Sequence, residues 1–375
     1  MPDGSYKDGK SFETTPMDIA KGISIGLAKR SIVAEVKIGD NEGIFWDLTR
    51  PLECDCELKI LTFNDPKGKE TFWHSSSHVL GQSMERMLKG KLTVGPALDE
   101  TQSLHNGGFY YDVDTTDLGD GIKLSESHYK SLEDLIKKIV KDKQDFKRIK
   151  LSKDNALEMF KFNKFKQELI TGIFDDMNER KVDSNDQYVT AYRCGPLIDL
   201  CRGPHIPNTS IIKALKIVKN GSTYWKNDNT RENLQRLYGI SFPDKKLMKE
   251  WEELRKRAEE SDHRVIAKKQ NLFFFDDMSP GSCFWLPHGA RIYNKLMELI
   301  QNEYRKRGFT QVITPNMYSL KLWEISGHAA KYKDDMFLFD VENTQFGLKP
   351  MNCPGHCLMY KHELRSYRDL PIRFA

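Results

Sequence analysis

A chain of 375 residues is long enough for two or three domains, and 39 % hydrophobic beside 30 % charged residues excludes disorder over most of it. No stretch approaches the roughly 20 apolar residues that span a bilayer, and the first residues lack the apolar core of a signal peptide, so we expect a cytoplasmic protein without a membrane partner. The net charge of +4 neither requires nor excludes nucleic acid. Seven irregularly spaced cysteines exclude a disulfide scaffold.

The amino-terminal residues predict a small α+β unit. An Asp3–Gly4 turn comes first, residues 17–23 favour a helix, and residues 32–36 and 58–62 favour short strands. This pattern resembles a TGS domain, a ubiquitin-like module. We therefore expect a TGS domain over residues 1–63.

Residues 64–246 combine helical patterns with aromatic strand signals and predict an α+β middle domain. Residues 108–113 are the clearest strand. Residues 131–140 are the clearest helix, because their apolar residues share one face and Ser131 and Asp134 suit a first turn. Four lysines at the end of this helix are better explained as a solvated face than as a phosphate site. They are Lys137, Lys138, Lys141 and Lys143.

Residues 247–270 are predicted to form a charged linker helix, and residues 271–375 a further α+β region. The longest predicted helix of that region covers residues 291–307 and ends at Gly308. We expect its apolar side chains to face inward; they are Ile292, Leu296, Leu299, Ile300 and Tyr304. A strand is expected at residues 311–314 and ends at Pro315, because proline cannot donate a ladder hydrogen bond.

Two histidines and a Cys/His pair in the middle domain have the chemistry of a site. His74 and His78 are four residues apart, so they share one face of a helix. Cys201 and His205 are separated by a Gly–Pro turn that folds them toward a common point. Such groups bind a metal or hold a water, and four nitrogen and sulfur ligands suffice for zinc. Each residue taken singly is more often structural, but the combination favours a site.

This combination resembles the editing domain that threonyl- and alanyl-tRNA synthetases share. Further matches to the threonyl family lie at residues 192–196 and 234–239. The resemblance implies a hydrolytic site whose principal residues are His78, Cys201 and His205. The other candidate catalytic residues that it implies are His74, Lys166 and Asp199.

Two assignments within this site stay open. Bacterial family members carry a histidine where this chain has Gln82, so the working pair is either His74 with His78 or His78 with Gln82. Lys166 aligns with a family lysine that handles the ester, and the alternative is a solvated surface lysine.

An editing site answers a discrimination problem that the resemblance implies. A pocket that binds the threonine hydroxyl rejects valine by roughly 10⁴ to 10⁵, but the methyl group missing from serine gives only about 1–3 kcal/mol. Hydrolysis of seryl-tRNA in a second site removes the error. The chemistry is ester cleavage by a positioned water, with imidazole as base or orienter and donors for the oxyanion. We expect Cys201 to position water or discriminate rather than act as a nucleophile.

The last residues carry a second family resemblance. Residues 349–375 contain Met351-Asn352-Cys353-Pro354-Gly355-His356 and resemble a segment of the threonyl-tRNA synthetase catalytic domain. The helix, strand and proline before them resemble motif 1 of class II synthetases, which forms a dimer interface. The resemblance implies that Cys353 is one of three protein ligands of a zinc ion that also binds threonine, and that Met351 lines the threonine pocket.

The resemblance covers essentially the whole chain and is best with the eukaryotic cytosolic branch. It implies a multidomain α+β threonine–tRNA ligase that uses ATP, Mg²⁺ and Zn²⁺, with tRNA(Thr), threonine and ATP as partners and a homodimer as the assembly. Motifs 2 and 3, two zinc-binding histidines and the anticodon-binding domain would follow Ala375. We therefore expect an incomplete zinc site and no aminoacylation by this chain alone. The alternatives are a free-standing deacylase and a non-catalytic tRNA-binding module.

Overall fold

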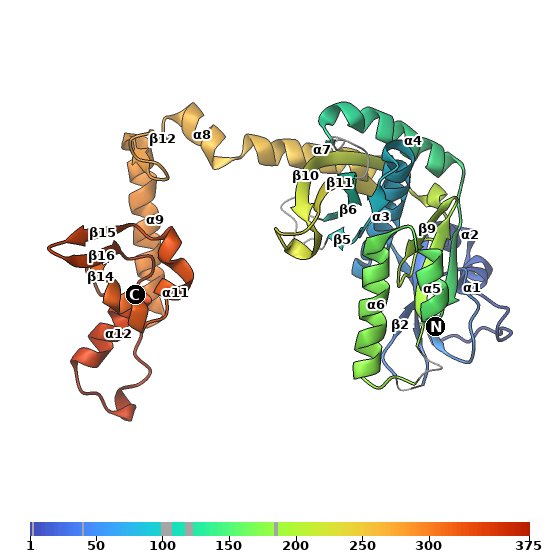
Figure 1. Cartoon of the computed structure of the whole chain (residues 1–375), viewed down its shortest axis with the longest axis horizontal. Helices are drawn as coiled ribbons and strands as arrows, with labels where there is room; N and C mark the ends of the chain where they lie inside the picture. Colours follow the sequence, from blue (N-terminus) through green and yellow to red (C-terminus); the bar gives the residue numbers. More distant parts are fainter. Residues whose placement is uncertain (2–3, 40, 99–106, 117–122, 184–186) are drawn as a thin grey trace. The chain divides into compact units, whose positions relative to one another are not determined.

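The computed structural model describes residues 1, 4–39, 41–98, 107–116, 123–183 and 187–375 (Figure 1). They form two units, Met1–Arg257 and Ala258–Ala375, which are described here one at a time. Asp3 of the predicted first turn lies outside the described residues. Within the described ranges, no helix combines the length and the apolar character needed to cross a membrane.

The first unit begins with a three-stranded antiparallel sheet in the order β2-β1-β3. Its elements are α1 (Pro16–Ile23), α2 (Ile25–Arg30), β1 (Ser31–Lys37), β2 (Ile44–Trp46) and β3 (Glu57–Thr62). Thr15 starts α1 with a capping box, in which its side chain accepts from the Asp18 amide and the Asp18 carboxylate accepts in return. The predicted helix and both predicted strands are confirmed.

A long helix crosses one face of a five-stranded sheet in the middle of the chain (Figure 1). The helix is α3 (Pro66–Leu88), and the strands are β4 (Lys91–Leu92), β5 (Ala97–Leu98), β6 (Gly108–Asp114), β10 (Ala214–Tyr224) and β11 (Asn233–Phe242). A Cβ atom on Gly81 would lie 2.8 Å from the ring of Tyr111. Glycine therefore lets α3 approach β6 closely, and most of α3 is buried.

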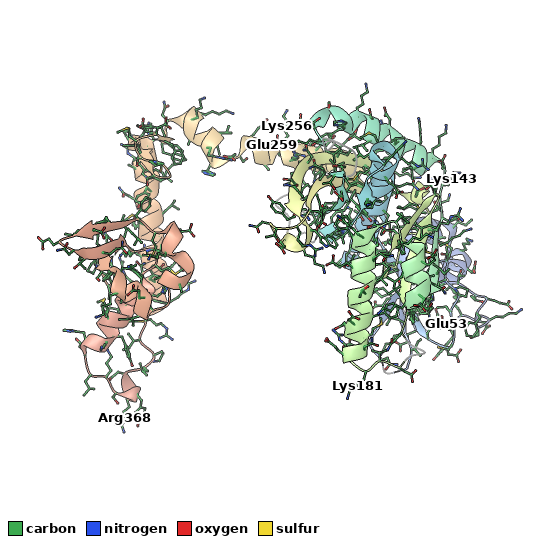
Figure 2. The ribbon with its side chains drawn as sticks, viewed as in Figure 1. Glu53, Lys143, Lys181, Lys256, Glu259 and Arg368 are labelled. Carbon is green, nitrogen blue, oxygen red and sulfur yellow. The ribbon has the colours of Figure 1, made fainter. Side chains whose placement is uncertain are left out.

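A second antiparallel sheet, in the order β7-β8-β9, lies in the same unit with three helices. The strands are β7 (Phe146–Leu151), β8 (Val189–Cys194) and β9 (Leu197–Leu200), and the helices are α4 (Tyr129–Lys141), α5 (Lys153–Met159) and α6 (Lys164–Glu179). Short 3₁₀ turns are η2 (Glu126–His128), η4 (Thr209–Ile211) and η5 (Trp225–Asn227). The helix predicted at residues 131–140 is confirmed as α4. Its four lysines are exposed, as Figure 2 shows for Lys143, which confirms the solvated face.

The amino-terminal sheet packs directly on α3. The ring centroid of Phe63, just after β3, lies 5.0 Å from that of Phe72 on α3. A Cβ atom on Gly68 would lie 1.9 Å from the carbonyl oxygen of Thr62, so the first turn of α3 contacts the end of β3. These contacts place the small sheet and the long helix in one packed core.

The charged segment predicted as one linker helix contains two helices, α7 (Lys245–Glu260) and α8 (His263–Gln270). The break has a local cause. Asp262 has backbone angles that are not helical, and its side chain accepts a 2.7 Å hydrogen bond from the Arg264 amide, which starts a new helix.

The second unit contains a hairpin, a long helix and a three-stranded sheet in the order β14-β16-β15. Its elements are β12 (Phe273–Phe275), β13 (Cys283–Trp285), α9 (Pro287–Lys306), β14 (Met317–Ser319), α10 (Leu320–Ile325), α11 (Ala329–Tyr332), η6 (Lys333–Asp335), β15 (Leu338–Val341), β16 (Thr344–Leu348), α12 (Cys353–His362) and η7 (Tyr367–Asp369). The long helix is confirmed. Gly308 follows it with φ of 72°, a left-handed conformation typical of a helix end.

Two predictions for this unit are wrong. The apolar residues of α9, including Leu296 and Leu299, are 42–55 % exposed, so the described part of the chain leaves that face open. Residues 311–314 form no strand. Thr310 makes a single parallel bridge with Phe374, and the Val312 amide donates to the carbonyl of Ala375 at 2.9 Å.

Candidate functional site

Four side chains from two distant segments meet inside the first unit. His74 and His78 lie one turn apart on α3, with ring centroids separated by 5.2 Å. Cys201 and His205 lie in the segment that follows β9. One nitrogen or sulfur atom from each of the four residues lies within 4.8 Å of the others. We call these four residues the His/Cys cluster.

The structure distinguishes between the two histidine pairings that the sequence leaves open. His74 and His78 are both in the cluster, whereas Gln82 bonds elsewhere. Its Nε2 donates to Gln144 Oε1 at 3.0 Å and to the carbonyl of Cys194 at 2.6 Å. Gln82 therefore connects α3 to the second sheet, and the pairing of His78 with Gln82 is not the one that forms.

The Cys201 sulfur lies between two imidazoles. Its Sγ is 3.3 Å from Nε2 of His74 and 3.2 Å from Nε2 of His205, and it accepts a hydrogen bond from the Gly203 amide at 3.3 Å. Burial alone would raise the pKa of this thiol, but His74 and, next, His205 outweigh burial and hold the pKa well below its usual value. The surroundings therefore favour the thiolate.

Asp199 is the common partner of three buried groups. Its Oδ1 is 2.5 Å from Nζ of Lys166 and its Oδ2 is 2.9 Å from Nδ1 of His78. The Tyr111 hydroxyl also donates to Oδ2. Burial opposes ionisation of this carboxyl, but the Lys166 charge and His78 outweigh it and hold the pKa well below its ordinary value. Asp199 is therefore a carboxylate that orients its neighbours.

Lys166 is buried, with 3 % of its surface exposed, so the alternative of a solvated surface lysine is wrong. The reason lies at the start of α6. The Asn163 side chain caps this helix by accepting from the amides of Phe165 and Lys166. The cap places Lys166 in the first turn, where its ammonium group reaches Asp199.

His78 is held with one ring nitrogen engaged and the other free to act. Burial lowers its pKa, but the hydrogen bond to Asp199 and the nearby Cys201 outweigh burial and raise the pKa to about 9. The ring is therefore protonated at neutral pH. Its Nδ1 bonds Asp199, while Nε2 is buried with no hydrogen-bond partner among the described residues.

His205 is enclosed on several sides. Its Nδ1 is 3.1 Å from the Ser75 hydroxyl, its ring stacks on Phe146 at 4.8 Å, and the Tyr192 ring meets it edge-on at 4.5 Å. Its backbone amide donates to Asp47 at 2.8 Å. Burial lowers the pKa of His205 to about 4, so this imidazole is neutral at neutral pH.

The cluster has an inner and an outer half. His78 and His205 are buried, whereas His74 and Cys201 are partly exposed. The side chains of the cluster that reach the surface are therefore those of His74 and Cys201.

The residues also fit a metal ion, because three nitrogens and one sulfur are a ligand set that Zn²⁺ takes in proteins. Asp199 holds Nδ1 of His78, and Ser75 lies at Nδ1 of His205. Partners of this kind orient metal-binding histidines and leave the second nitrogen for the metal. The buried, unpartnered Nε2 of His78 has this arrangement, so the cluster is consistent with a zinc site.

The residues predicted for a second site are placed differently. Cys353 is exposed at the first residue of α12, and Met351 is 42 % exposed. Among the described residues, Cys353 belongs to no group of three or more potential metal ligands. Its assignment to zinc and that of Met351 to threonine stay predictions.

Three contributors to the site were missed from the sequence. Tyr111 lies within the strand predicted at residues 108–113, and Ser75 directly follows His74 in the sequence. The alternation of side chains along the strand could have indicated that Tyr111 faces the interior. The position of a hydroxyl next to His74 could have indicated Ser75. Asp47 had no signal, because it lies 158 residues before its partner His205.

Comparison with protein families gives two matches. Residues 1–62 match the TGS domain. Residues 189–238 match the threonyl and alanyl tRNA synthetase second additional domain. The second match contains Asp199, Cys201 and His205.

Individual relatives match along the whole chain. It is 50 % identical over 375 residues to threonine–tRNA ligase, mitochondrial 1, of Arabidopsis thaliana, covering 100 % of this chain and 50 % of that protein. It is 51 % identical to threonine–tRNA ligase 1, cytoplasmic, of Rattus norvegicus, again covering 100 % of this chain and 50 % of that protein. The chain thus spans about half the length of these relatives.

A solved structure is similar over a shorter stretch. It is the RNA binding domain of threonyl-tRNA synthetase from Cryptosporidium parvum Iowa II, with 64 % sequence identity and a TM-score of 0.30. The match covers 30 % of this chain and 29 % of that one.

Proposed function

The chain belongs to the threonyl-tRNA synthetase family, with a TGS domain and the family's second additional domain, and from this premise we propose that its first unit hydrolyses seryl-tRNA(Thr). The observation that carries the proposal is the buried network of Asp199, Lys166 and His78 beside the Cys201 thiolate. It brings charged donors and a water-positioning sulfur to one place, as ester hydrolysis requires.

The reaction of the whole protein is part of the proposal. We assign residues 1–63 to the TGS domain, 64–246 to the editing domain, 247–270 to a linker and 271–375 to part of a class II catalytic domain. The names of the relatives, threonine–tRNA ligases, support the joining of threonine to tRNA. The use of ATP and of tRNA(Thr) is part of our assignment. Mg²⁺, zinc at Cys353, threonine at Met351, a homodimer and a cytoplasmic location belong to this assignment.

Each side chain of the first unit has a distinct role in the hydrolysis. Asp199 stays ionised and orients His78, with Lys166 and Tyr111 fixing the carboxylate. His78 is protonated, and its unpartnered Nε2–H is the donor for the oxyanion that forms on the ester carbonyl.

The water is handled in the outer half of the cluster. We assign the general base to His74 in its unprotonated form, because it is the partly exposed imidazole and lies 3.3 Å from the sulfur that would hold the water. In this form of the site the sulfur keeps its hydrogen bond from the Gly203 amide and lies 3.2 Å from Nε2 of His205. The water oxygen bonds to the seryl carbonyl carbon, and the water proton passes to His74. The bond from that carbon to the ribose oxygen then breaks, and this oxygen takes the proton.

Zinc fits the same four residues, and when bound it would polarise a carbonyl and lower the pKa of a bound water. In that state Asp199 and Ser75 keep the rings of His78 and His205 oriented through their Nδ1 atoms. Zinc titration of the chain, compared with the Cys201→Ala chain, tests whether the cluster binds it.

The test of the proposed function is serine release from seryl-tRNA(Thr) by the 375-residue chain without ATP, with threonyl-tRNA(Thr) as the ester to be spared. Cys201→Ala removes the sulfur of the cluster. Cys194→Ala is the matched control, because Cys194 is a cysteine of the same unit that lies beside Gln144 rather than in the cluster.

We expect the unaltered chain and the Cys194→Ala chain to release serine, and the Cys201→Ala chain to be slower by about 100-fold or more. Binding of tRNA without serine release would contradict the proposal and favour the non-catalytic tRNA-binding alternative. Release that persists in Cys201→Ala would show hydrolysis that does not use this cluster.

A further inference from the structure

One buried carboxylate of the TGS domain reaches the His/Cys cluster. Asp47 follows β2 within residues 1–62 and is 8 % exposed. Its Oδ1 accepts from the backbone amide of His205 at 2.8 Å, and its Oδ2 accepts from the Tyr192 hydroxyl at 2.7 Å. Both oxygens of a residue outside the second additional domain are thus bonded to residues within that domain's match, one to His205 of the cluster and the other to Tyr192 on β8.

These two hydrogen bonds act on the same imidazole. The first fixes the backbone of His205. The second fixes Tyr192, whose ring meets the His205 ring edge-on, with 81° between the planes. A Cβ atom on Gly203 would lie 2.1 Å from the Tyr192 hydroxyl oxygen, so this turn has room for the tyrosine only because it is glycine.

The carboxylate is held firmly with respect to α3, which carries the other two histidines. Phe63 packs on Phe72, and the first turn of α3 contacts the end of β3 through Gly68. Ser75 on α3 accepts a hydrogen bond from the Ile206 amide at 3.0 Å and lies beside Nδ1 of His205. The His205 segment is therefore held from the TGS side by Asp47 and from the α3 side by Ser75.

Burying a carboxyl group costs free energy. For Asp47 this cost is offset mainly by the hydrogen bonds from the His205 amide and the Tyr192 hydroxyl. Burial raises the pKa of Asp47, and the hydrogen bonds from His205 and Tyr192 act in the opposite direction. An apolar side chain of similar size would fill the same space at lower cost, so the polar group is explained by the two hydrogen bonds that it accepts.

We propose that Asp47 is a positioning residue for the hydrolytic site, through which the TGS domain takes part in editing. This inference rests on the proposed hydrolysis of seryl-tRNA(Thr). Asp47 touches neither the ester nor the water; it acts by fixing the His205 ring, and through that ring the place of the Cys201 sulfur, 3.2 Å from Nε2.

The test compares three variants of the 375-residue chain. Asp47→Ala removes both hydrogen bonds. Asp47→Asn keeps an acceptor for the His205 amide and offers an N–H to the Tyr192 oxygen, so it is the conservative rescue. Asp18→Ala is the matched control, because it removes the capping box of α1 in the same domain without touching the cluster.

Single-turnover hydrolysis of seryl-tRNA(Thr) is measured against enzyme concentration, together with thermal unfolding. We expect Asp47→Ala to lower the maximal rate constant by about 10- to 100-fold, as when a group that orients a functional side chain is lost. The concentration for half-maximal rate should stay unchanged, because Asp47 does not contact the substrate. Asp47→Asn should recover most of the rate, and Asp18→Ala should lower the melting temperature without changing the rate constant.

A second readout does not depend on activity. The ¹⁵N chemical shifts of the His205 imidazole should change in Asp47→Ala and stay unchanged in Asp18→Ala. If the unaltered chain released no serine, the proposed function would fail, while these shifts would still report whether Asp47 positions His205. Unchanged shifts, or a full rate constant in Asp47→Ala, would overturn the inference.

Discussion

Two regions of this chain carry Cys/His motifs, and the structure treats them differently. In the first unit, His74, His78, Cys201 and His205 converge within 4.8 Å, although 127 residues separate His74 from Cys201. In the second unit, Cys353 is exposed at the start of α12. A motif becomes a chemical site only where other elements bring it partners.

The partners in the first unit are mostly groups outside the motif. Asp199 orients His78, Lys166 and Tyr111 hold Asp199, and Asp47 holds the His205 backbone. Burial strengthens these interactions, because charges in a low-dielectric interior act on one another more strongly than at the surface. We therefore expect changes to the buried partners of the His/Cys cluster to be costly and changes at Cys353 not to be.

The largest expected effect follows from removing Asp199. Asp199→Ala leaves the Lys166 ammonium buried without its carboxylate, and breaking a buried ion pair in this way costs about 3–5 kcal/mol. Urea denaturation should show this loss in the first unit. Asp154→Ala, an exposed aspartate at the start of α5, is the control and should change stability by less than about 0.5 kcal/mol. Equal losses in the two variants would contradict the buried network.

The pH dependence of stability should reveal His78. Its pKa is raised from 6.5 to about 9 on folding, so its stabilising contribution is complete below pH 6.5 and is lost as the pH rises through 9. A shift of this size corresponds to about 3 kcal/mol. Denaturation of the metal-free chain and of His78→Gln over this range measures the difference. A constant difference between them from pH 6.5 to 9 would show that His78 is not protonated in this way.

The tight approach of α3 to β6 gives a smaller effect. Gly81→Ala places a methyl group 2.8 Å from the Tyr111 ring, and overpacking of this kind costs about 1–3 kcal/mol. Gly172→Ala is the matched control, because Gly172 lies in α6 with nothing within 4 Å of the added Cβ. That change should stabilise the chain by about 0.5–1 kcal/mol, since alanine favours a helix. Similar denaturation midpoints for the two variants would argue against close packing at Tyr111.

The smallest effect is expected at the second motif. Cys353→Ser should leave stability within about 0.5 kcal/mol of the unaltered chain, because the side chain is exposed and not in a ligand cluster of described residues. Serine release should also be unchanged. A clear loss of stability or of serine release in Cys353→Ser would contradict this expectation, because it would show that the Cys353 side chain makes contacts that matter for folding or for hydrolysis.

The sequence predicted the elements and the motif better than the contacts. Alternating and helical patterns identified β1, β6 and α4 within two residues. The four-residue spacing placed His74 and His78 on one helix face, but it left open whether His78 works with His74 or with Gln82. The burial of Lys166 was not predictable from its neighbours, because it depends on Asp199, 33 positions later in the numbering. The prediction that the apolar side chains of α9 face inward is wrong for the described residues, where they are exposed. A pattern of apolar residues identifies a face that favours burial, but it does not identify a partner for that face.

Hydrolysis by the His/Cys cluster is tested most directly by single-turnover serine release from seryl-tRNA(Thr), measured side by side for Cys201→Ala and Cys353→Ala in the 375-residue chain. We expect Cys201→Ala to release serine at least about 100-fold more slowly, while Cys353→Ala keeps the rate of the unaltered chain. Equal rates in the two variants, or loss only in Cys353→Ala, would contradict the claim that the His/Cys cluster of the first unit performs the hydrolysis.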